Sequence, residues 1–165
     1  MIQSTTEKLF TDIFAEYGDA IFRFCIVKVS NVDIAEDMTQ EVFMRYWGYL
    51  KEGTDVANPR ALLYTIANNL AKDWYKKKKS DSLDDQMEQG FAPVEKSPSA
   101  EILASHREII EALERLDEKD RELMLLRFVE GLDPKDIAIM YSETANVISV
   151  RINRATKRLQ SILHV

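Results

Sequence analysis

Amide and lysine side chains recur at helical spacing between residues 68 and 79, and this chemistry suits nucleic acid. The amides are Asn68 and Asn69, the first lysines are Lys72 and Lys76, and Tyr75 lies at the edge of the same predicted face. The positive charge continues through the next three side chains, Lys77, Lys78 and Lys79. Amides hydrogen-bond base edges, an aromatic ring stacks on an unpaired base, and lysines neutralise phosphates. The pattern therefore predicts a nucleic-acid surface.

A second basic segment closes the chain. From Thr144 onward there are four basic side chains and no acidic one. A short helix at 134–141, a turn at 142–144 and a longer helix through about Leu163 are typical of a DNA-binding helix-turn-helix. Its exposed side chains, which suit major-groove edges and phosphates, are expected to be Asn146, Ser149, Val150, Asn153, Arg154 and Lys157, with Arg158 adding charge. Taken alone, a solvated amphipathic helix gives the same pattern.

Catalytic and metal chemistry have no matching set of residues. The chain has one cysteine, Cys25, and two histidines, His106 and His164. One cysteine excludes an internal disulfide and a cysteine-based zinc cluster. No Ser/His/Asp, Cys/His or metal-ligand spacing occurs, and there is no glycine-rich phosphate loop. The sequence therefore predicts a protein that is not an enzyme, without a cofactor, a metal or a small-molecule substrate.

The net charge of −6 over 165 residues argues against nucleic acid until it is divided along the chain. Residues 58–80 carry 6 basic side chains and 1 acidic one, whereas residues 81–120 carry 4 basic and 12 acidic ones. The basic side chains therefore gather where the two nucleic-acid surfaces are predicted, and the acids gather elsewhere.

Helical periodicity predicts the elements that position these residues. Apolar residues at three- and four-residue steps predict helices over about 9–25 and 34–50, the second opening with a capping box at Asp33 and Glu36. Asn58 and Pro59 predict the start of a third helix that runs to about Lys78. The buried side of that third helix is expected to be Leu62, Leu63, Ile66, Ala67, Leu70 and Trp74, and that of the last helix Val147, Ile148, Ile152, Leu159 and Leu163.

A change of composition divides the chain. Residues 80–98 are acidic, contain two prolines and three serines, and are too long for a connection inside one compact domain. The expected fold is all-α, with two small helical domains, 1–79 and 99–165, joined by this flexible linker. No apolar run reaches the length of a membrane span and the first residues lack a signal-peptide core, so we expect a cytoplasmic protein without membrane insertion.

Three ordered blocks resemble those of bacterial extracytoplasmic-function (ECF) sigma factors. They are AEDMTQEVFMRYW at 35–47, NPRALLYTIANNLAKDWYKKK at 58–78 and LDEKDRELMLLRFVEGLDPKDIA at 116–138. The resemblance covers nearly the whole chain. It implies a protein that binds core RNA polymerase, recognises promoter DNA and promotes strand opening, with domain 1–79 as sigma region 2 and domain 99–165 as sigma region 4.

The resemblance also implies roles for particular residues. The second helix would bind the largest subunit of the polymerase through Asp37, Gln40, Glu41, Met44 and Arg45. The third helix would recognise and open the promoter element nearest the start site, with residues 54–58 as a pocket for an extruded base. The last helix would read the upstream element, the linker would pass near the RNA path, and an anti-sigma factor is an expected partner.

Two departures and one alternative accompany the resemblance. The turn carries Ser142 and Glu143 where the family usually has glycine and an aliphatic residue. The usual Thr-Val-Lys-Ser-Arg that opens recognition is replaced by residues 147–151, which lack the lysine and offer Val150 for an apolar contact. The alternative is a stand-alone helix-turn-helix regulator, which accounts for residues 131–163 but leaves the first domain without a purpose.

Overall fold

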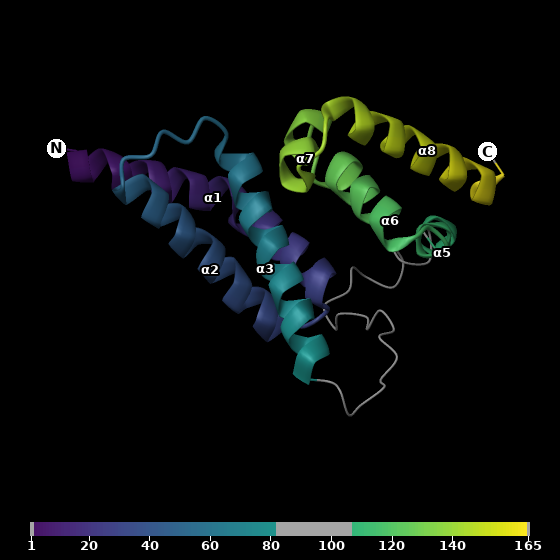
Figure 1. The fold of residues 1–165 in the computed structure, drawn as a ribbon, viewed down its shortest axis with the longest axis horizontal. Coiled ribbons are helices and arrows are strands. Elements are labelled where there is room, and N and C mark those ends of the chain that lie inside the picture. The colour runs from purple at the N-terminus through teal and green to yellow at the C-terminus, as the bar shows by residue number, and fades with distance from the viewer. Residues whose placement is uncertain (1, 82–106, 165) are drawn as a thin grey trace. The chain divides into compact units, whose positions relative to one another are not determined.

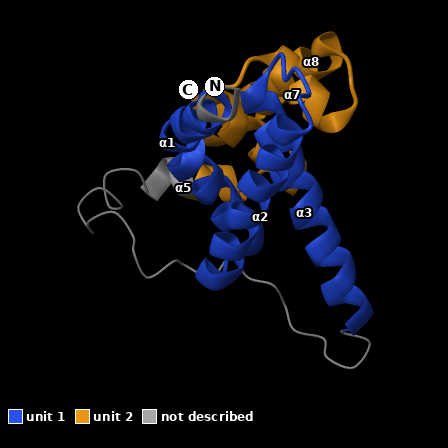
Figure 2. Cartoon of the chain, turned by 90° about the vertical axis from the view of Figure 1, so that its left-hand side faces the viewer, with its two compact units in different colours: residues 1–94 blue, residues 95–165 orange. Residues whose placement is uncertain are grey.

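The computed structural model of the chain describes residues 2–81 and 107–164, and these fold into helices and short connections without a strand among them (Figure 1). The chain divides into two compact units, residues 1–94 and 95–165 (Figure 2). This confirms the all-α class with two helical regions. Of the predicted linker 80–98, Ser80 and Asp81 continue a helix, and the rest lies outside the described residues, as does His106. Within the described ranges, no helix has the length and hydropathy of a membrane span.

Unit 1 is built from α1 (Ile2–Val29), α2 (Val32–Lys51) and α3 (Pro59–Asp81), and each of these helices contacts the other two. Aromatic rings join α1 to α2: Phe14 meets Phe43 edge-on at 4.8 Å between centroids. Cys25 is buried, and burial raises the pKa of its thiol to about 11. A thiol that stays protonated at neutral pH is a poor nucleophile, so Cys25 serves the core.

The boundaries of α2 and α3 follow from their caps. α2 begins two residues earlier than the predicted capping box, because Asn31 is the cap: its side-chain oxygen accepts a hydrogen bond from the Ile34 N–H at 3.0 Å. α3 begins where predicted, with the Asn58 side chain accepting from the Ala61 N–H at 3.0 Å. Between them, Gly53 takes a positive φ of 72°, which a glycine adopts without steric cost.

Unit 2 contains α5 (Arg107–Glu114), α6 (Glu118–Met124), a π-helical turn η1 (Leu125–Val129), α7 (Pro134–Tyr141) and α8 (Ala145–Leu163). Part of its core is Leu116, Met124 and Ala155. Gly131 follows the helical run with a positive φ of 66°. The conformation of Gly131 lets the N–H of the next residue, Leu132, donate a hydrogen bond to the Leu126 carbonyl at 2.9 Å.

One arginine fixes the end of α5 and was missed by sequence reasoning. The Arg121 guanidinium donates to the carbonyl oxygens of Leu113, Glu114 and Leu116, at 3.0, 2.9 and 3.0 Å. These carbonyls belong to the last turn of α5 and the residues after it. The last carbonyls of a helix have no N–H partner within the helix, so they need another donor. A planar guanidinium can serve several such acceptors at once, so Arg121 holds α5 against α6.

The turn between α7 and α8 has helix-turn-helix geometry although it lacks the glycine. Ser142 occupies the left-handed conformation, with φ 54° and ψ 40°, at the position where the family usually has glycine. The turn closes through the Glu143 N–H, which donates to the Ala138 carbonyl at 3.0 Å. Thr144 then caps α8, its side chain accepting from the Val147 N–H at 3.3 Å. The sequence departure therefore leaves the turn intact but strained at one residue.

Replacing Ser142 with glycine is expected to stabilise the protein. A side chain in the left-handed region costs about 1 kcal/mol, and glycine removes that cost. The free energy of unfolding, followed by circular dichroism in urea, should rise by about 1 kcal/mol. The control is Ser149→Gly in α8, where glycine lowers helix stability by a similar amount. A loss of stability in Ser142→Gly would contradict the strained turn.

Candidate nucleic-acid interface

The exposed face of α3 gathers most of the predicted nucleic-acid residues. Asn69, Lys72 and Lys76 are exposed and lie three or four residues apart, so they share one side of the helix. The remaining lysines, Lys77, Lys78 and Lys79, are exposed on the last turns of α3. Positive side chains are favourable there because the helix C-terminus carries partial negative charge. We call these six residues, Asn69, Lys72, Lys76, Lys77, Lys78 and Lys79, the α3 basic surface.

Asn68 does not belong to that surface, and its predicted exposure is wrong. The residue has 0% exposure, and neither side-chain amide atom has a hydrogen-bond partner among the described residues. The cause is the rotation of α3: Tyr64, Asn68 and Ala71 face the core, whereas Leu62 and Leu70 are only half-buried. A polar residue therefore lies on the buried face, where the apolar pattern could not reveal it.

Replacing Asn68 with leucine is expected to stabilise unit 1. A buried amide without partners costs about 1–3 kcal/mol, and leucine has a similar size without that cost. Urea unfolding monitored by the fluorescence of Trp47 and Trp74, both in this unit, measures the change. The matched control is Asn69→Leu, which should change stability by less than about 0.5 kcal/mol. A destabilised Asn68→Leu protein would mean that the amide is hydrogen-bonded in solution.

Trp74 and Tyr75 of α3 also differ from expectation. Tyr75 is half-buried, and its hydroxyl donates to the main-chain carbonyl of Lys28 at the end of α1, so the ring is held against α1. Trp74, assigned to the core from sequence, is only half-buried, with the Lys78 ammonium 4.9 Å from its ring centroid. Tyr75, and not Trp74, therefore forms a hydrogen bond that joins α3 to α1.

Residues 54–58, the predicted pocket for an extruded base, form the connection from α2 to α3. Thr54, Asp55 and Ala57 are exposed, and Val56 and Asn58 are half-buried. The Thr54 N–H donates to the Tyr49 carbonyl at 3.1 Å, which fixes the start of the connection beside the end of α2. The segment thus precedes the α3 basic surface directly, and its pocket role stays a prediction.

The predicted polymerase-binding residues share one face of α2. Asp37, Gln40 and Arg45 are exposed, Glu41 is half-buried, and Met44 is 68% exposed. The opposite side of the helix carries the buried residues Ala35, Met38, Val42, Phe43 and Tyr46.

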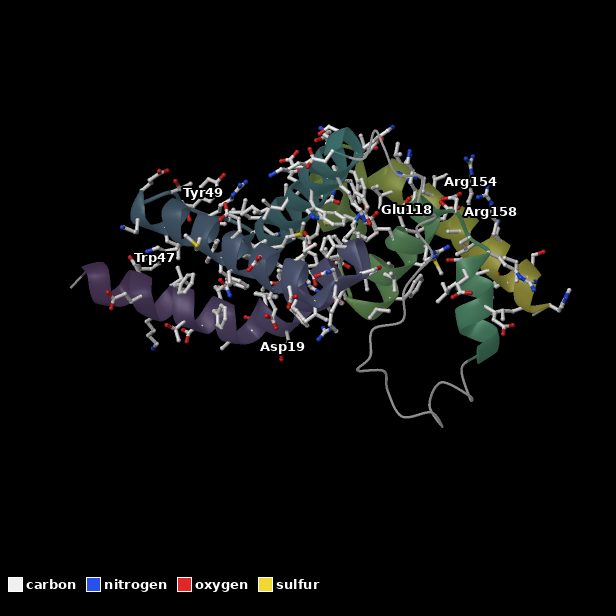
Figure 3. All side chains as sticks on the ribbon, turned by 90° about the horizontal axis from the view of Figure 1, so that it is seen from below. Asp19, Trp47, Tyr49, Glu118, Arg154 and Arg158 are labelled. Atoms are coloured by element: carbon white, nitrogen blue, oxygen red, sulfur yellow. The ribbon has the colours of Figure 1, made fainter. Side chains whose placement is uncertain are left out.

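An ion pair orders part of that face. The Arg45 Nε lies 2.7 Å from the Glu41 Oε1. In Figure 3, Tyr49 points away from α1, whereas Trp47 lies between α1 and α2; the Trp47 ring is 5.2 Å from that of Phe10. An exposed methionine among charged side chains is typical of a surface that binds another protein.

The predicted DNA-reading residues of α8 are all exposed. They are Asn146, Ser149, Val150, Asn153, Arg154, Lys157 and Arg158. The buried side of the helix is narrower than predicted: Ile148, Ile152 and Ala155 are buried, but Val147 is 38% exposed. The Ser149 hydroxyl donates to the Ala145 carbonyl at 2.8 Å, so it is already hydrogen-bonded within the helix.

Arg158 differs from the other α8 residues because it has acidic partners in its own unit. Its guanidinium lies 2.8 Å from an Asp120 oxygen and 3.3 Å from an Asp117 oxygen, both at the start of α6. The Asp120 N–H, and then the charge of Arg158, hold the pKa of Asp117 below its usual value. Figure 3 shows Arg154 and Arg158 on neighbouring turns of α8. Arg158 therefore joins α8 to α6 in this conformation.

Comparison with known proteins gives two family matches. Residues 13–80 match the family model described as sigma-70 region 2, and residues 106–159 match the model described as sigma-70, region 4. The first match contains the α2 face and the α3 basic surface, and the second contains the helix-turn-helix.

The chain is also similar in sequence to curated sigma factors. The chain is 28% identical to the ECF RNA polymerase sigma factor BldN of Streptomyces coelicolor, over 93% of this chain and 60% of that protein. It is 29% identical to the ECF sigma factor EcfG of Rhodopseudomonas palustris, over 97% and 87%. The chain thus spans less than two thirds of the length of BldN and most of EcfG.

Solved structures agree with the fold. The sigma factor RpoE of Bartonella quintana, in complex with the anti-sigma factor NepR, superposes with a TM-score of 0.71 at 26% identity, covering 96% of this chain and 98% of that one. CnrH, in complex with the cytosolic domain of CnrY, superposes with a TM-score of 0.64 at 19% identity, covering 99% and 95%.

Proposed function

The chain belongs to the ECF sigma factors, and from that premise we propose how its surfaces divide the work of transcription initiation. The protein binds core RNA polymerase through the α2 face of Asp37, Gln40, Glu41, Met44 and Arg45. The α3 basic surface recognises and opens the proximal promoter element. The exposed side of α8 reads the upstream element. We propose domains 1–79 and 99–165, with 80–98 as the linker, and a cytoplasmic location beside the polymerase.

One observation carries this proposal: positive charge is exposed on one helix of each unit, in a chain whose net charge is −6. Lysine and arginine neutralise phosphates, and two separate basic helices suit two separate promoter elements. The acidic remainder weakens nonspecific attraction to DNA, so the free protein depends on the polymerase for affinity. The family is a non-catalytic initiation factor, and no catalytic role is proposed for this chain.

An anti-sigma factor is the expected regulator. The sigma factor RpoE, which shares the fold at 26% identity, was solved in complex with the anti-sigma factor NepR. We propose that such a partner covers the polymerase-binding face of α2, because Met44 offers exposed apolar surface there. A protein that covers this face would exclude the polymerase by occupying the same residues.

The stand-alone regulator remains the competing function, and a gel shift separates the two. The probe is a promoter fragment whose start site has been mapped by run-off transcription with core polymerase and this chain. We expect a specific complex only when core polymerase and the chain are both present. Specific binding of the fragment by the chain alone, at the affinities usual for repressors, would favour the stand-alone regulator. The control fragment has the upstream element scrambled.

A further inference from the structure

We propose that Lys28, at the end of α1, is a further phosphate contact of the nucleic-acid surface on α3. The inference rests on the proposed function, since it adds one more protein contact to the promoter DNA strand that α3 binds. Lys28 lies outside the segment whose sequence pattern predicted binding, 47 residues from the tyrosine that contacts it. The packing of α1 against α3 brings Lys28 close to the α3 basic surface.

The first observation is the position of its main chain. The Tyr75 hydroxyl donates to the Lys28 carbonyl, so the last turn of α1 lies beside the fifth turn of α3. Lys72 is three residues before Tyr75 and Lys79 is four residues after it. Residues at these separations are neighbours on a helix surface, about 5–6 Å apart at Cβ. Lys28 therefore borders the same turns of α3 as two lysines of the basic surface.

The second observation is the direction of its side chain. The Lys28 ammonium lies 5.5 Å from the centroid of the Phe24 ring, one turn back on α1. Phe24 in turn meets Tyr64 of α3 edge-on, at 5.3 Å between centroids. The Lys28 side chain is thus half-buried, with its charged end over Phe24, a residue that itself packs against α3.

The chemistry favours phosphate over a base. An ammonium group is a compact point charge, which neutralises phosphate without the planar fork that reads base edges. Residues 72–79 of α3 already carry five lysines and one acid, Asp73. A phosphate at this end of α3 would add negative charge beside a strongly basic stretch of the helix. The ligand is therefore the sugar-phosphate backbone of the strand that α3 holds, and the contact is independent of sequence.

The test measures the salt dependence of DNA binding. Holoenzyme is assembled from core polymerase and the full chain, and the probe is a labelled promoter duplex with a preformed bubble. Affinity is measured across a salt series by fluorescence anisotropy. Each lost phosphate contact lowers the slope of log affinity against log salt by about 0.7 to 0.9. Lys28→Gln should lower the slope by this amount, whereas Lys28→Arg should retain it.

The matched control is Lys8→Gln, an exposed lysine about 30 Å away on the same helix. It should leave the slope unchanged. If Lys28→Gln is unstable at the assay temperature, Lys28→Met removes the charge while keeping the apolar stem over Phe24. An unchanged slope in the Lys28 variants, with a lowered slope when Lys76–Lys79 are neutralised, overturns the inference and leaves the proposed function standing. An unchanged slope in both sets overturns the α3 assignment as well.

Discussion

Replacing Lys76, Lys77, Lys78 and Lys79 with glutamate is expected to abolish promoter opening while polymerase binding continues. The change reverses four positive charges on the last turns of α3. Each neutralised phosphate contributes to affinity through counterion release, so open complexes should fall by at least about a hundredfold at physiological salt. Permanganate reactivity of unpaired thymines measures opening, and native gel electrophoresis with core polymerase measures association.

The controls separate the position of the charges from their number. Lys8, Lys51, Arg115 and Lys119 are exposed basic residues outside the α3 basic surface, and their replacement with glutamate makes the same charge change. This control protein should open promoters nearly as well as the wild type. Because glutamates are unfavourable at a helix C-terminus, a second variant with four glutamines tests the loss of charge without that effect. If the lysine variants lost polymerase association instead, the proposed division between α2 and α3 would be wrong.

Replacing Asp37 and Gln40 together is expected to give the reverse result, with polymerase association lost. Both side chains are exposed, so alanine should change the stability of unit 1 by less than about 0.5 kcal/mol per site. Residues at the centre of a protein interface commonly contribute about 2 kcal/mol or more each. Two such contributions, about 4 kcal/mol together, should raise the dissociation constant for core polymerase by several hundredfold or more.

Fluorescence titration of labelled chain with core polymerase gives that constant directly. The matched control is Asp12→Ala with Gln160→Ala, since both residues are exposed and lie on other helices. Retention of wild-type affinity by the Asp37/Gln40 variant would remove α2 from the polymerase interface. Unchanged thermal unfolding of the variant shows that any loss arises from binding and not from folding.

Much of the local structure was predictable because it depends on neighbouring residues. Asn58 and Pro59 start α3 as expected, and Gly131 ends η1, since caps and positive φ angles are set within a few residues. Four residues of the α2 face, Asp37, Gln40, Met44 and Arg45, are exposed because they recur at helical spacing opposite an apolar stripe. In these cases the sequence pattern and the contacts that it predicts lie within a few residues of each other.

The failures come from contacts between segments that are far apart in the chain. Asn68 is buried because α3 packs on α1 and α2 through Tyr64 and Ala71, a rotation of the helix that its own apolar residues do not specify. Tyr75 binds a carbonyl 47 residues away, and Arg158 binds acids 38 and 41 residues away. No periodicity within one helix encodes such partners, and they decide which side chains remain free for DNA.

Run-off transcription with purified core polymerase tests the central claim most directly. Core polymerase alone, this chain alone and the two together are given the same genomic template fragments. The account predicts discrete transcripts with defined start sites only when both proteins are present, and their loss when Lys76–Lys79 are changed to glutamate. Transcripts that do not depend on the chain, or that persist in the lysine variant at the wild-type level, would contradict it.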